Sequence, residues 1–125
     1  MGIGNYKNKY KTNTPLEERK TTCKFIIDKY NGDRIPIIIQ KDYREKNIEE
    51  ATNIKYLSSY DMTFSQVMLV LRKKIKNIDS TMAIYLFTEN GVIVNSQELV
   101  STLYDKYKDE DGFLYLFYTG ENTFG

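Results

Sequence analysis

The stretch DGFLYLFYTGENTFG, residues 111–125, decides most about the fold, because it joins an apolar run to a short polar ending. Aromatic and aliphatic side chains follow one another from Phe113 to Tyr118, a composition typical of a strand. Small and polar residues then lead to Phe124 and Gly125. The sequence therefore predicts a final strand that is followed by a tail.

Two strands and a helix are expected directly upstream. MAIYLFT (82–88) and VIV (92–94) predict strands on either side of the tight turn Glu89-Asn90-Gly91. Asn95 and Glu98 together open a helix, because their spacing is that of a capping box. The buried face of this helix is predicted to consist of Leu99, Val100, Leu103, Tyr104 and Tyr107.

Another helix, MTFSQVMLVLRKKI (62–75), carries a complete start signal. Thr63 is the expected cap, and Gln66 lies three residues later, as a capping box requires. A stripe of apolar side chains at helical spacing predicts its buried face. This stripe consists of Phe64, Val67, Met68, Leu71 and Ile75.

Two strands are expected before that helix. RIPIIIQK (34–41) is typical of a short buried strand. Pro36 cannot donate a hydrogen bond to a ladder, so we expect it near the strand's start or on an unpaired flank. IKYLSS (54–59) alternates with a period of two residues, which predicts a strand with side chains to bury on each face.

A further helix precedes these strands. Thr14 is the expected cap, Pro15 suits the first helical position, and Glu17 completes a capping box. Gly32 suits the left-handed residue at the other end. The apolar face of this helix is predicted to consist of Leu16, Cys23, Ile26, Ile27 and Tyr30.

In chain order the expected elements are helix, strand, strand, helix, strand, short strand, helix and strand. Two strands, a helix and further strands is the element order of the β-grasp, the ubiquitin fold. We therefore predict an α+β, ubiquitin-like β-grasp with an N-terminal helical extension. Residues 1–30 form the extension, residues 31–118 the core and residues 119–125 a flexible C-terminal tail, all within one compact domain.

Composition favours a binding or carrier protein over an enzyme. The chain has 125 residues, of which 41% are hydrophobic, so it can bury one core. No apolar run approaches the roughly 18 residues of a transmembrane helix. The absence of histidine argues against histidine-based catalysis and most zinc sites. Cys23 is the only cysteine, so we expect no internal disulfide and a reducing compartment. We also expect no cofactor and no metal.

The net charge of +1 conceals a difference between the two ends. Residues 1–30 carry a net charge of +4, and residues 98–125 carry a net charge of −4. A basic end attracts anionic membranes or partner surfaces through its long-range field. The alternative explanation is a solvated helix face whose charges have no partner.

The terminal glycine suits a chemical handle, because no side chain crowds its carbonyl. At this point five segments, in order, resemble the autophagy-related ubiquitin-like modifiers, the family of GABARAP and the yeast autophagosome modifier. The resemblance covers about residues 15–125. The five segments are DRIPIIIQK, KYLSS, MTFSQVMLVLRKKI, IYLF and YKDEDGFLYLFYTGENTFG.

The resemblance implies a modifier conjugated through Gly125 to phosphatidylethanolamine, with Phe124 recognised as part of the tail. Such a protein is a substrate of activating and conjugating enzymes and of a processing and deconjugating cysteine protease, and is itself not an enzyme. It serves autophagosome formation and recruits cargo receptors and adaptors, without binding nucleic acid. Its expected location is the cytoplasm and, when lipid-conjugated, the membrane of the autophagosome or another organelle.

The resemblance also implies a groove for partners with an aromatic-x-x-aliphatic motif, which add a strand to a sheet edge. The edge consists of Lys55, Tyr56, Leu57 and Ser58. The pocket for the aromatic anchor consists of Ile26, Pro36, Lys55, Leu57 and Phe113. The pocket for the aliphatic anchor consists of Tyr56, Met62, Val67, Val70 and Leu71. Arg34 and Arg72 either meet acidic residues beside the motif or hold the domain together.

Several positions depart from the family pattern, among them an inserted Gly32 and a shorter loop from Gly91 to Asn95. Thr22 stands where an acidic residue is usual, and Ser58 and Ser59 stand where an aliphatic residue and proline are usual. The serines are expected to make the aliphatic pocket more polar. Two other functions remain open: an unconjugated β-grasp adaptor or tether, and a modifier attached to a protein lysine.

Overall fold

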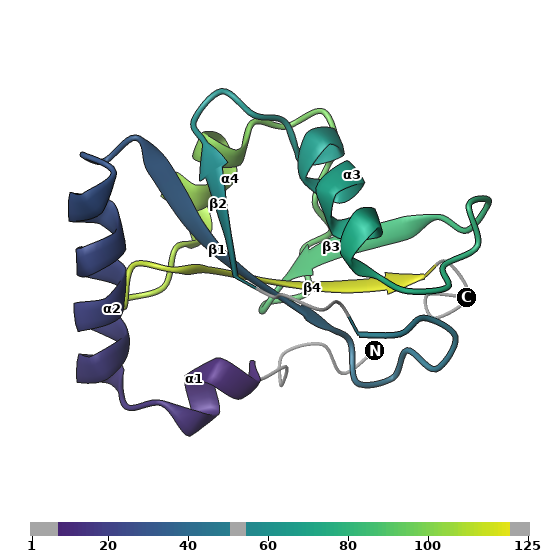
Figure 1. The fold of residues 1–125 in the computed structure, drawn as a ribbon, viewed down its shortest axis with the longest axis horizontal. Coiled ribbons are helices and arrows are strands. Elements are labelled where there is room, and N and C mark those ends of the chain that lie inside the picture. Colours follow the sequence, from purple (N-terminus) through teal and green to yellow (C-terminus); the bar gives the residue numbers. More distant parts are fainter. Residues whose placement is uncertain (1–7, 51–54, 121–125) are drawn as a thin grey trace.

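The computed structural model describes residues 8–50 and 55–120, and within these ranges four helices pack around a four-stranded sheet (Figure 1). The helices are α1 (Lys9–Asn13), α2 (Leu16–Lys29), α3 (Phe64–Lys74) and α4 (Val100–Tyr107). The strands are β1 (Arg34–Lys41), β2 (Lys55–Ser59), β3 (Ile84–Thr88) and β4 (Leu114–Gly120). The predicted α+β class is confirmed, and two helices precede the first strand.

The strands lie in the order β2-β1-β4-β3. The two central strands are parallel to each other, and each outer strand is antiparallel to its neighbour. β1 and β4 are flanked on both sides, which explains why both are buried almost continuously and are rich in apolar residues. Pro36 precedes the pairing with β4, which begins at Ile37 and Leu114, so its missing N–H costs no bond on that side.

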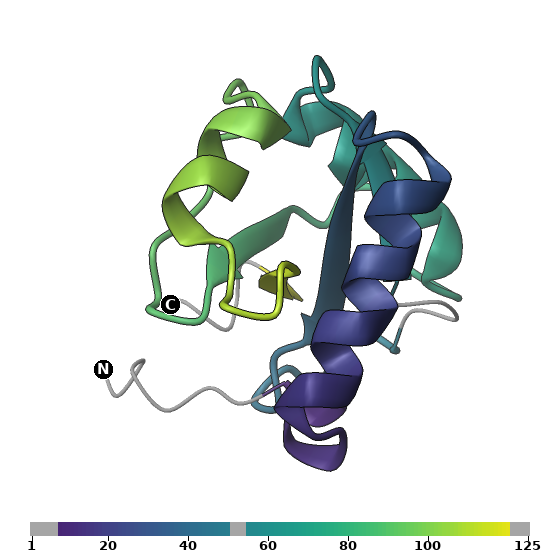
Figure 2. The ribbon, with the colours of Figure 1, turned by 90° about the vertical axis from the view of Figure 1, so that its left-hand side faces the viewer.

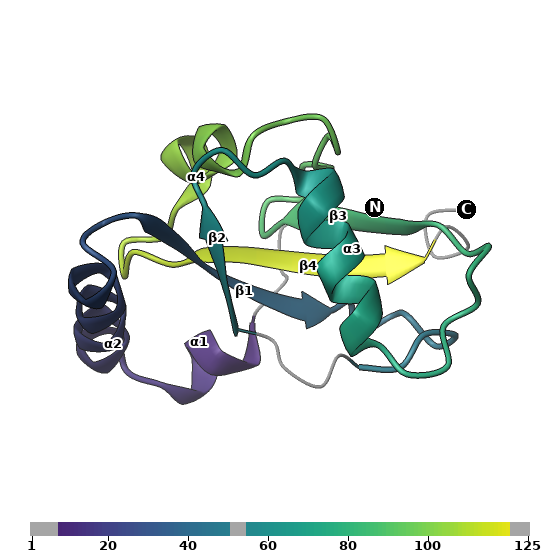
Figure 3. The same cartoon turned by 45° about the horizontal axis from the view of Figure 1, so that its top comes forward.

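The sheet separates two apolar cores. The larger one, here called the α3-side core, lies beneath α3 and α4 and includes Ile35, Phe64, Val67, Leu71 and Tyr118. The smaller one, the α2-side core, consists of Cys23, Ile38, Phe113 and Tyr115, with Tyr10, Ile26 and Ile27 packed against it. Figure 2 shows α2 and α4 on opposite sides of β1, and Figure 3 shows α3 lying across the strands.

The start of α3 confirms its predicted capping box. The Thr63 side chain meets the first turn, and the Gln66 side chain accepts a hydrogen bond from the Thr63 N–H at 2.9 Å. The left-handed end of α2 is also as predicted, because Gly32 has φ of +74° and its N–H donates to the Ile27 carbonyl. Local side-chain chemistry therefore determines both of these helix ends.

The predicted cap of α2 is wrong. The helix begins at Leu16, Pro15 occupies the N-cap position, and no side chain caps it. Thr14 instead terminates α1 in an extended conformation, and its carbonyl accepts a hydrogen bond from Arg19 Nη1 at 2.6 Å. Because only two residues separate α1 from α2, Thr14 serves the end of the first helix rather than the start of the second.

The region between β3 and α4 also differs from the prediction. α4 begins at Val100, and Leu99 is 42% exposed instead of buried, because it forms an isolated bridge with Thr63 at the start of α3. Residues 92–94 form no strand in the described chain, and only one bridge joins Phe87 to Ile93. Backbone pairing with α3 and β3 therefore replaces the expected first helical turn and short strand.

β4 continues two residues beyond the predicted end at Tyr118. It pairs with β3 as far as Gly120, which lies opposite Ile84. Among the described residues, no helix has the length and apolar character needed to cross a bilayer.

Candidate functional site

Strand β2 forms one edge of the sheet, and among the described residues it pairs only with β1. Successive side chains of a strand point to opposite faces. Lys55 and Leu57 therefore face the side of α2, whereas Tyr56 and Ser58 face the side of α3. The register agrees, since Lys55 lies opposite Ile38 of the α2-side core, and Tyr56 packs against the α3-side core. The edge thus presents different side chains on the two faces of the sheet.

The residues predicted to hold an aromatic anchor lie together on the α2 side. Pro36 is the cross-strand partner of Leu57, and Ile26 packs against the core to which Phe113 belongs. Lys55 is exposed, Ile26 and Leu57 are half-buried, and Pro36 and Phe113 are buried. The group therefore runs from an exposed charged side chain, through half-buried apolar side chains, to a buried aromatic ring.

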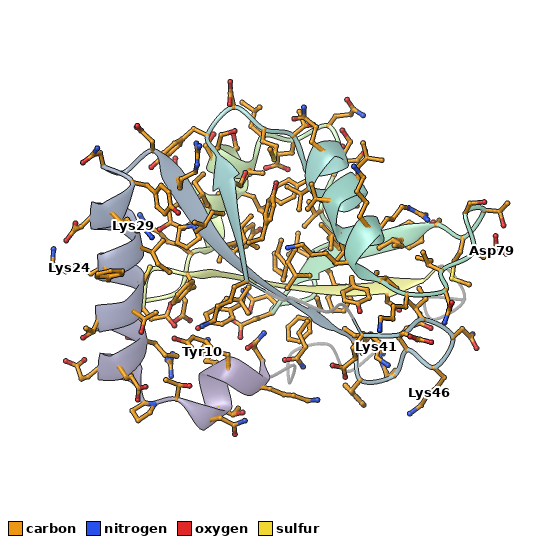
Figure 4. The ribbon with its side chains drawn as sticks, viewed as in Figure 1. Tyr10, Lys24, Lys29, Lys41, Lys46 and Asp79 are labelled. Atoms are coloured by element: carbon orange, nitrogen blue, oxygen red, sulfur yellow. The ribbon has the colours of Figure 1, made fainter. Side chains whose placement is uncertain are left out.

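Tyr10 of α1 joins this group, which the sequence analysis did not foresee. Its ring meets Phe113 edge to face, with 5.7 Å between the ring centroids, and Lys55 Nζ lies 4.6 Å from its centroid. Figure 4 shows Tyr10 beside the sheet. The Asn8 side chain fixes α1 here by accepting the Tyr10 N–H at 2.8 Å. Asn8, a favourable N-cap residue just before Tyr10, was the available signal.

The residues predicted to hold an aliphatic anchor lie on the α3 side. The Tyr56 hydroxyl is 3.2 Å from Met62 Sδ, and burial raises the Tyr56 pKa while nearby Arg34 opposes that shift. Met62 and Val70 are half-buried, whereas Val67 and Leu71 are buried in the α3-side core. A partner would therefore meet Tyr56, Met62 and Val70 before either buried residue.

Ser58 and the two predicted arginines have distinct surroundings. Ser58 is buried, and its hydroxyl donates to the Ser59 carbonyl at 2.9 Å, so its polarity is satisfied within β2 itself. Arg34 is exposed at the start of β1, opposite Ser59. Arg72 donates to the Met82 carbonyl and thereby ties α3 to the segment before β3. Arg72 therefore has an intramolecular role, whereas Arg34 remains accessible to a partner.

Lys11 is held by two carboxylates and is not a solvated cation. Its Nζ lies 2.6 Å from Asp109 and 3.1 Å from Glu89. Burial lowers the Lys11 pKa, but the hydrogen bonds to both carboxylates outweigh it and raise the pKa overall. The basic N-terminal region thus meets the acidic C-terminal region inside one molecule, which neither interpretation of the charge asymmetry anticipated.

A second and more deeply buried ion pair lies beside the Lys11 cluster. Arg19 Nε donates to Asp111 at 2.8 Å, and these side chains are 8% and 0% exposed. Tyr115 donates to the same carboxylate at 2.5 Å, and burial together with this carboxylate raises the Tyr115 pKa. Arg19 Nη1 also donates to the Lys11 and Thr14 carbonyls. One guanidinium therefore connects α1 and α2 to the segment before β4.

The tail residues Phe124 and Gly125 lie outside the described residues. The final described residue is Gly120, whose N–H donates to the Glu45 carboxylate at 2.6 Å. Within the described ranges, no group of three or more histidine, cysteine, aspartate or glutamate side chains is placed to hold a metal ion. Glu45 was not foreseen, because it lies in a charged connection without periodicity.

The fold defines a class, the ubiquitin-like proteins, extended here by two N-terminal helices. A sequence model described as "Autophagy protein Atg8 ubiquitin like" matches residues 18–125. The chain belongs to this Atg8 family of ubiquitin-like autophagy proteins. Members of the family are modifiers and not themselves enzymes.

Individual relatives agree over nearly the whole chain. Autophagy-related protein 8 of Pichia angusta is 43% identical over 119 residues, which cover 95% of this chain and 92% of the relative. The protein of the same name from Candida albicans is 40% identical, covering 95% of this chain and 85% of the relative. The crystal structure of Trypanosoma brucei ATG8 is similar with a TM-score of 0.86 and 37% identity, covering 96% of this chain and all of that one.

Proposed function

We propose that this protein is a modifier conjugated through Gly125 to phosphatidylethanolamine, and that it recruits partners to autophagosomal membranes. Family membership supports this proposal, because it places the chain in a pathway of ubiquitin-like autophagy proteins. The partners are activating and conjugating enzymes, a processing cysteine protease and motif-bearing cargo receptors. The protein is cytoplasmic before conjugation and is anchored to the membrane by the lipid afterwards.

The observation that carries the recruiting function is that β2 lies at the edge of the sheet between two different surfaces, where among the described residues it pairs only with β1. An extended peptide can pair its backbone with an edge strand and place alternate side chains in pockets. The α2-side surface offers Lys55, Leu57 and Ile26 to an aromatic residue, with buried Phe113 beneath them. The α3-side surface offers Tyr56, Met62 and Val70 to an aliphatic residue. In this proposal Arg34, which is exposed at the start of β1, meets acidic residues beside such a motif.

In this proposal recruitment and conjugation also use different parts of the molecule. The last described residue of β4 lies at the end of the molecule opposite α2 (Figure 1). A tail reaction at that end leaves the α2-side surface accessible. The adenylation and thioester steps occur in partner enzymes, so the contribution of this chain is to present a carboxylate without a side chain at the reacting centre.

The test is reconstitution with the cognate activating and conjugating enzymes and liposomes containing phosphatidylethanolamine. Intact mass should show the lipid on the wild-type chain and none on a chain lacking Gly125. Peptide binding should be equal for the two, because β2 is unaffected. Attachment to a protein lysine in place of lipid would support a protein modifier, and no attachment at all would support an unconjugated adaptor.

A further inference from the structure

The connection between β1 and β2 holds the end of the final strand. Its described part, residues 42–50, is here called the β1–β2 connection. The Asp42 N–H donates to the Tyr118 carbonyl at 2.9 Å, and the Tyr118 hydroxyl donates to the Glu49 carbonyl at 2.8 Å. Two hydrogen bonds thus hold this connection along β4 before the strand reaches its last two residues.

Glu45 makes the next contact along β4. Its side chain is 2% exposed. One carboxylate oxygen accepts from the Gly120 N–H at 2.6 Å and from the Thr119 hydroxyl at 3.1 Å, and the other accepts from the Asn47 N–H at 2.7 Å. Hydrogen bonds to an ionised acceptor are stronger than neutral ones, and a buried charge requires them. The carboxylate therefore fastens the last residues of β4 to the connection.

Gly120 fits this site closely because it has no side chain. A Cβ atom there would lie 3.0 Å from Ile48 Cδ1 and 3.1 Å from both Glu45 Oε1 and Met82 Sδ. The backbone of Gly120 is therefore enclosed by the connection on one side and by the segment before β3 on the other. This requirement is steric, since Gly120 is not among the glycines with positive φ.

The contact between Glu45 and Gly120 lies directly before the C-terminal tail. Gly120 is the last residue of β4, and five residues separate it from the end of Gly125. Five residues span at most about 18 Å when fully extended. Because this tether is short, the place and direction in which it leaves β4 determine which positions Gly125 can reach.

We propose that Glu45 is a positioning residue for the tail, because it fixes the backbone from which Gly125 must be delivered to the activating enzyme. This inference rests on the proposed function of Gly125. Glu45 takes no part in the chemistry. It raises the fraction of molecules whose tail leaves the sheet in the direction that the enzyme accepts, and an apparent affinity scales with that fraction.

The test is steady-state kinetics of tail activation by the cognate activating enzyme, with this chain as the varied substrate. Glu45→Ala should raise KM on the order of tenfold and leave kcat within about twofold, since delivery is impaired but the carboxylate is intact. Glu45→Gln keeps one acceptor oxygen and should restore most of the loss. Gly120→Ala disturbs the same contact from the other side and should raise KM in the same way.

Two matched controls separate positioning from general loosening. Tyr118→Phe removes a hydrogen bond between the same connection and β4, but leaves Glu45 and Gly120 in contact. Lys46→Ala changes an exposed residue of the connection, whose side chain points outward in Figure 4. Both variants should keep the wild-type KM.

Amide hydrogen exchange gives a readout that needs no enzyme. The Gly120 N–H should lose protection in Glu45→Ala and keep it in Tyr118→Phe. A wild-type chain that is not activated would overturn the proposed function itself. If the wild type is activated, an unchanged KM in Glu45→Ala, or an equal rise in Tyr118→Phe, would overturn the positioning role alone.

Discussion

At the residue scale, Tyr10 links the N-terminal extension to the candidate groove. Its ring contacts Phe113 and lies beneath Lys55 Nζ. Tyr10→Ala should lower the free energy of unfolding by about 1–3 kcal/mol, because apolar and aromatic contacts are lost. Urea denaturation measures this change, and Tyr10→Phe, which keeps the ring, is the control. A Tyr10→Ala variant as stable as Tyr10→Phe would show that the ring does not stabilise the fold.

Lys55 and Leu57 test the groove directly. We expect Leu57→Ala to weaken binding of an acidic peptide with a Trp-x-x-Leu motif by roughly 1–3 kcal/mol, through lost apolar contact. Lys55→Glu should also weaken binding, because it reverses the charge at the rim. Isothermal titration calorimetry measures both. Lys24→Glu, on the outer side of α2 (Figure 4), is the matched charge control. Wild-type affinity in both groove variants would exclude this edge as the binding site.

Cys23 makes stability depend on pH in the alkaline range. Burial raises the pKa of its thiol from 9.0 to about 11. The folded state therefore keeps a proton that the unfolded chain releases, so stability should fall as pH rises through this window. Urea denaturation at pH 8 and pH 10.5 measures the fall, which should be smaller in Cys23→Ala by at most about 1.4 kcal/mol per pH unit. Equal slopes for the two chains would contradict the assignment.

At the element scale, Arg19 connects α1 and α2 to the segment before β4. It contacts Asp111, whose side chain is fully buried, and the carbonyls that end α1. Arg19→Ala leaves that carboxylate without its guanidinium and should cost about 3–5 kcal/mol of unfolding free energy. Chemical denaturation measures the loss. Lys20→Ala, at an exposed neighbouring position, should change stability by less than about 1 kcal/mol. A similarly small effect for Arg19→Ala would mean that the pair does not dock the helices.

At the scale of the whole molecule, the opposite charges of the two ends meet within the fold. Lys11 contacts Glu89 in the turn after β3 and Asp109 before β4. Lys11→Glu should therefore lower the melting temperature by roughly 5 °C or more, because three carboxylates would then lie together. Lys9→Glu disturbs only an exposed pair and is the control. Differential scanning calorimetry measures the melting temperatures of both variants. An unchanged melting temperature in Lys11→Glu would show that Lys11 is a solvent-facing cation whose ion pairs do not stabilise the fold.

What the sequence determined by itself was local or periodic. The capping box at Thr63 and Gln66, the left-handed Gly32 and the two-residue period of β2 depend on neighbouring residues, so the sequence predicted all three. The order of the expected helices and strands was enough to predict the β-grasp. Five matching sequence segments were enough to suggest the family.

Only the tertiary structure decided which distant groups meet. The Lys11 and Arg19 ties span 98 and 92 residues, and the Glu45 contact with Gly120 spans 75. The same long-range contacts explain the errors at helix and strand ends. Leu99 pairs with Thr63, so α4 begins later in the sequence than predicted. β4 continues to Gly120 because it pairs there with β3 and contacts Glu45. Periodicity reports how a segment faces a core, but a hydrogen bond or ion pair needs two atoms within about 3 Å, and only the packed chain sets that distance.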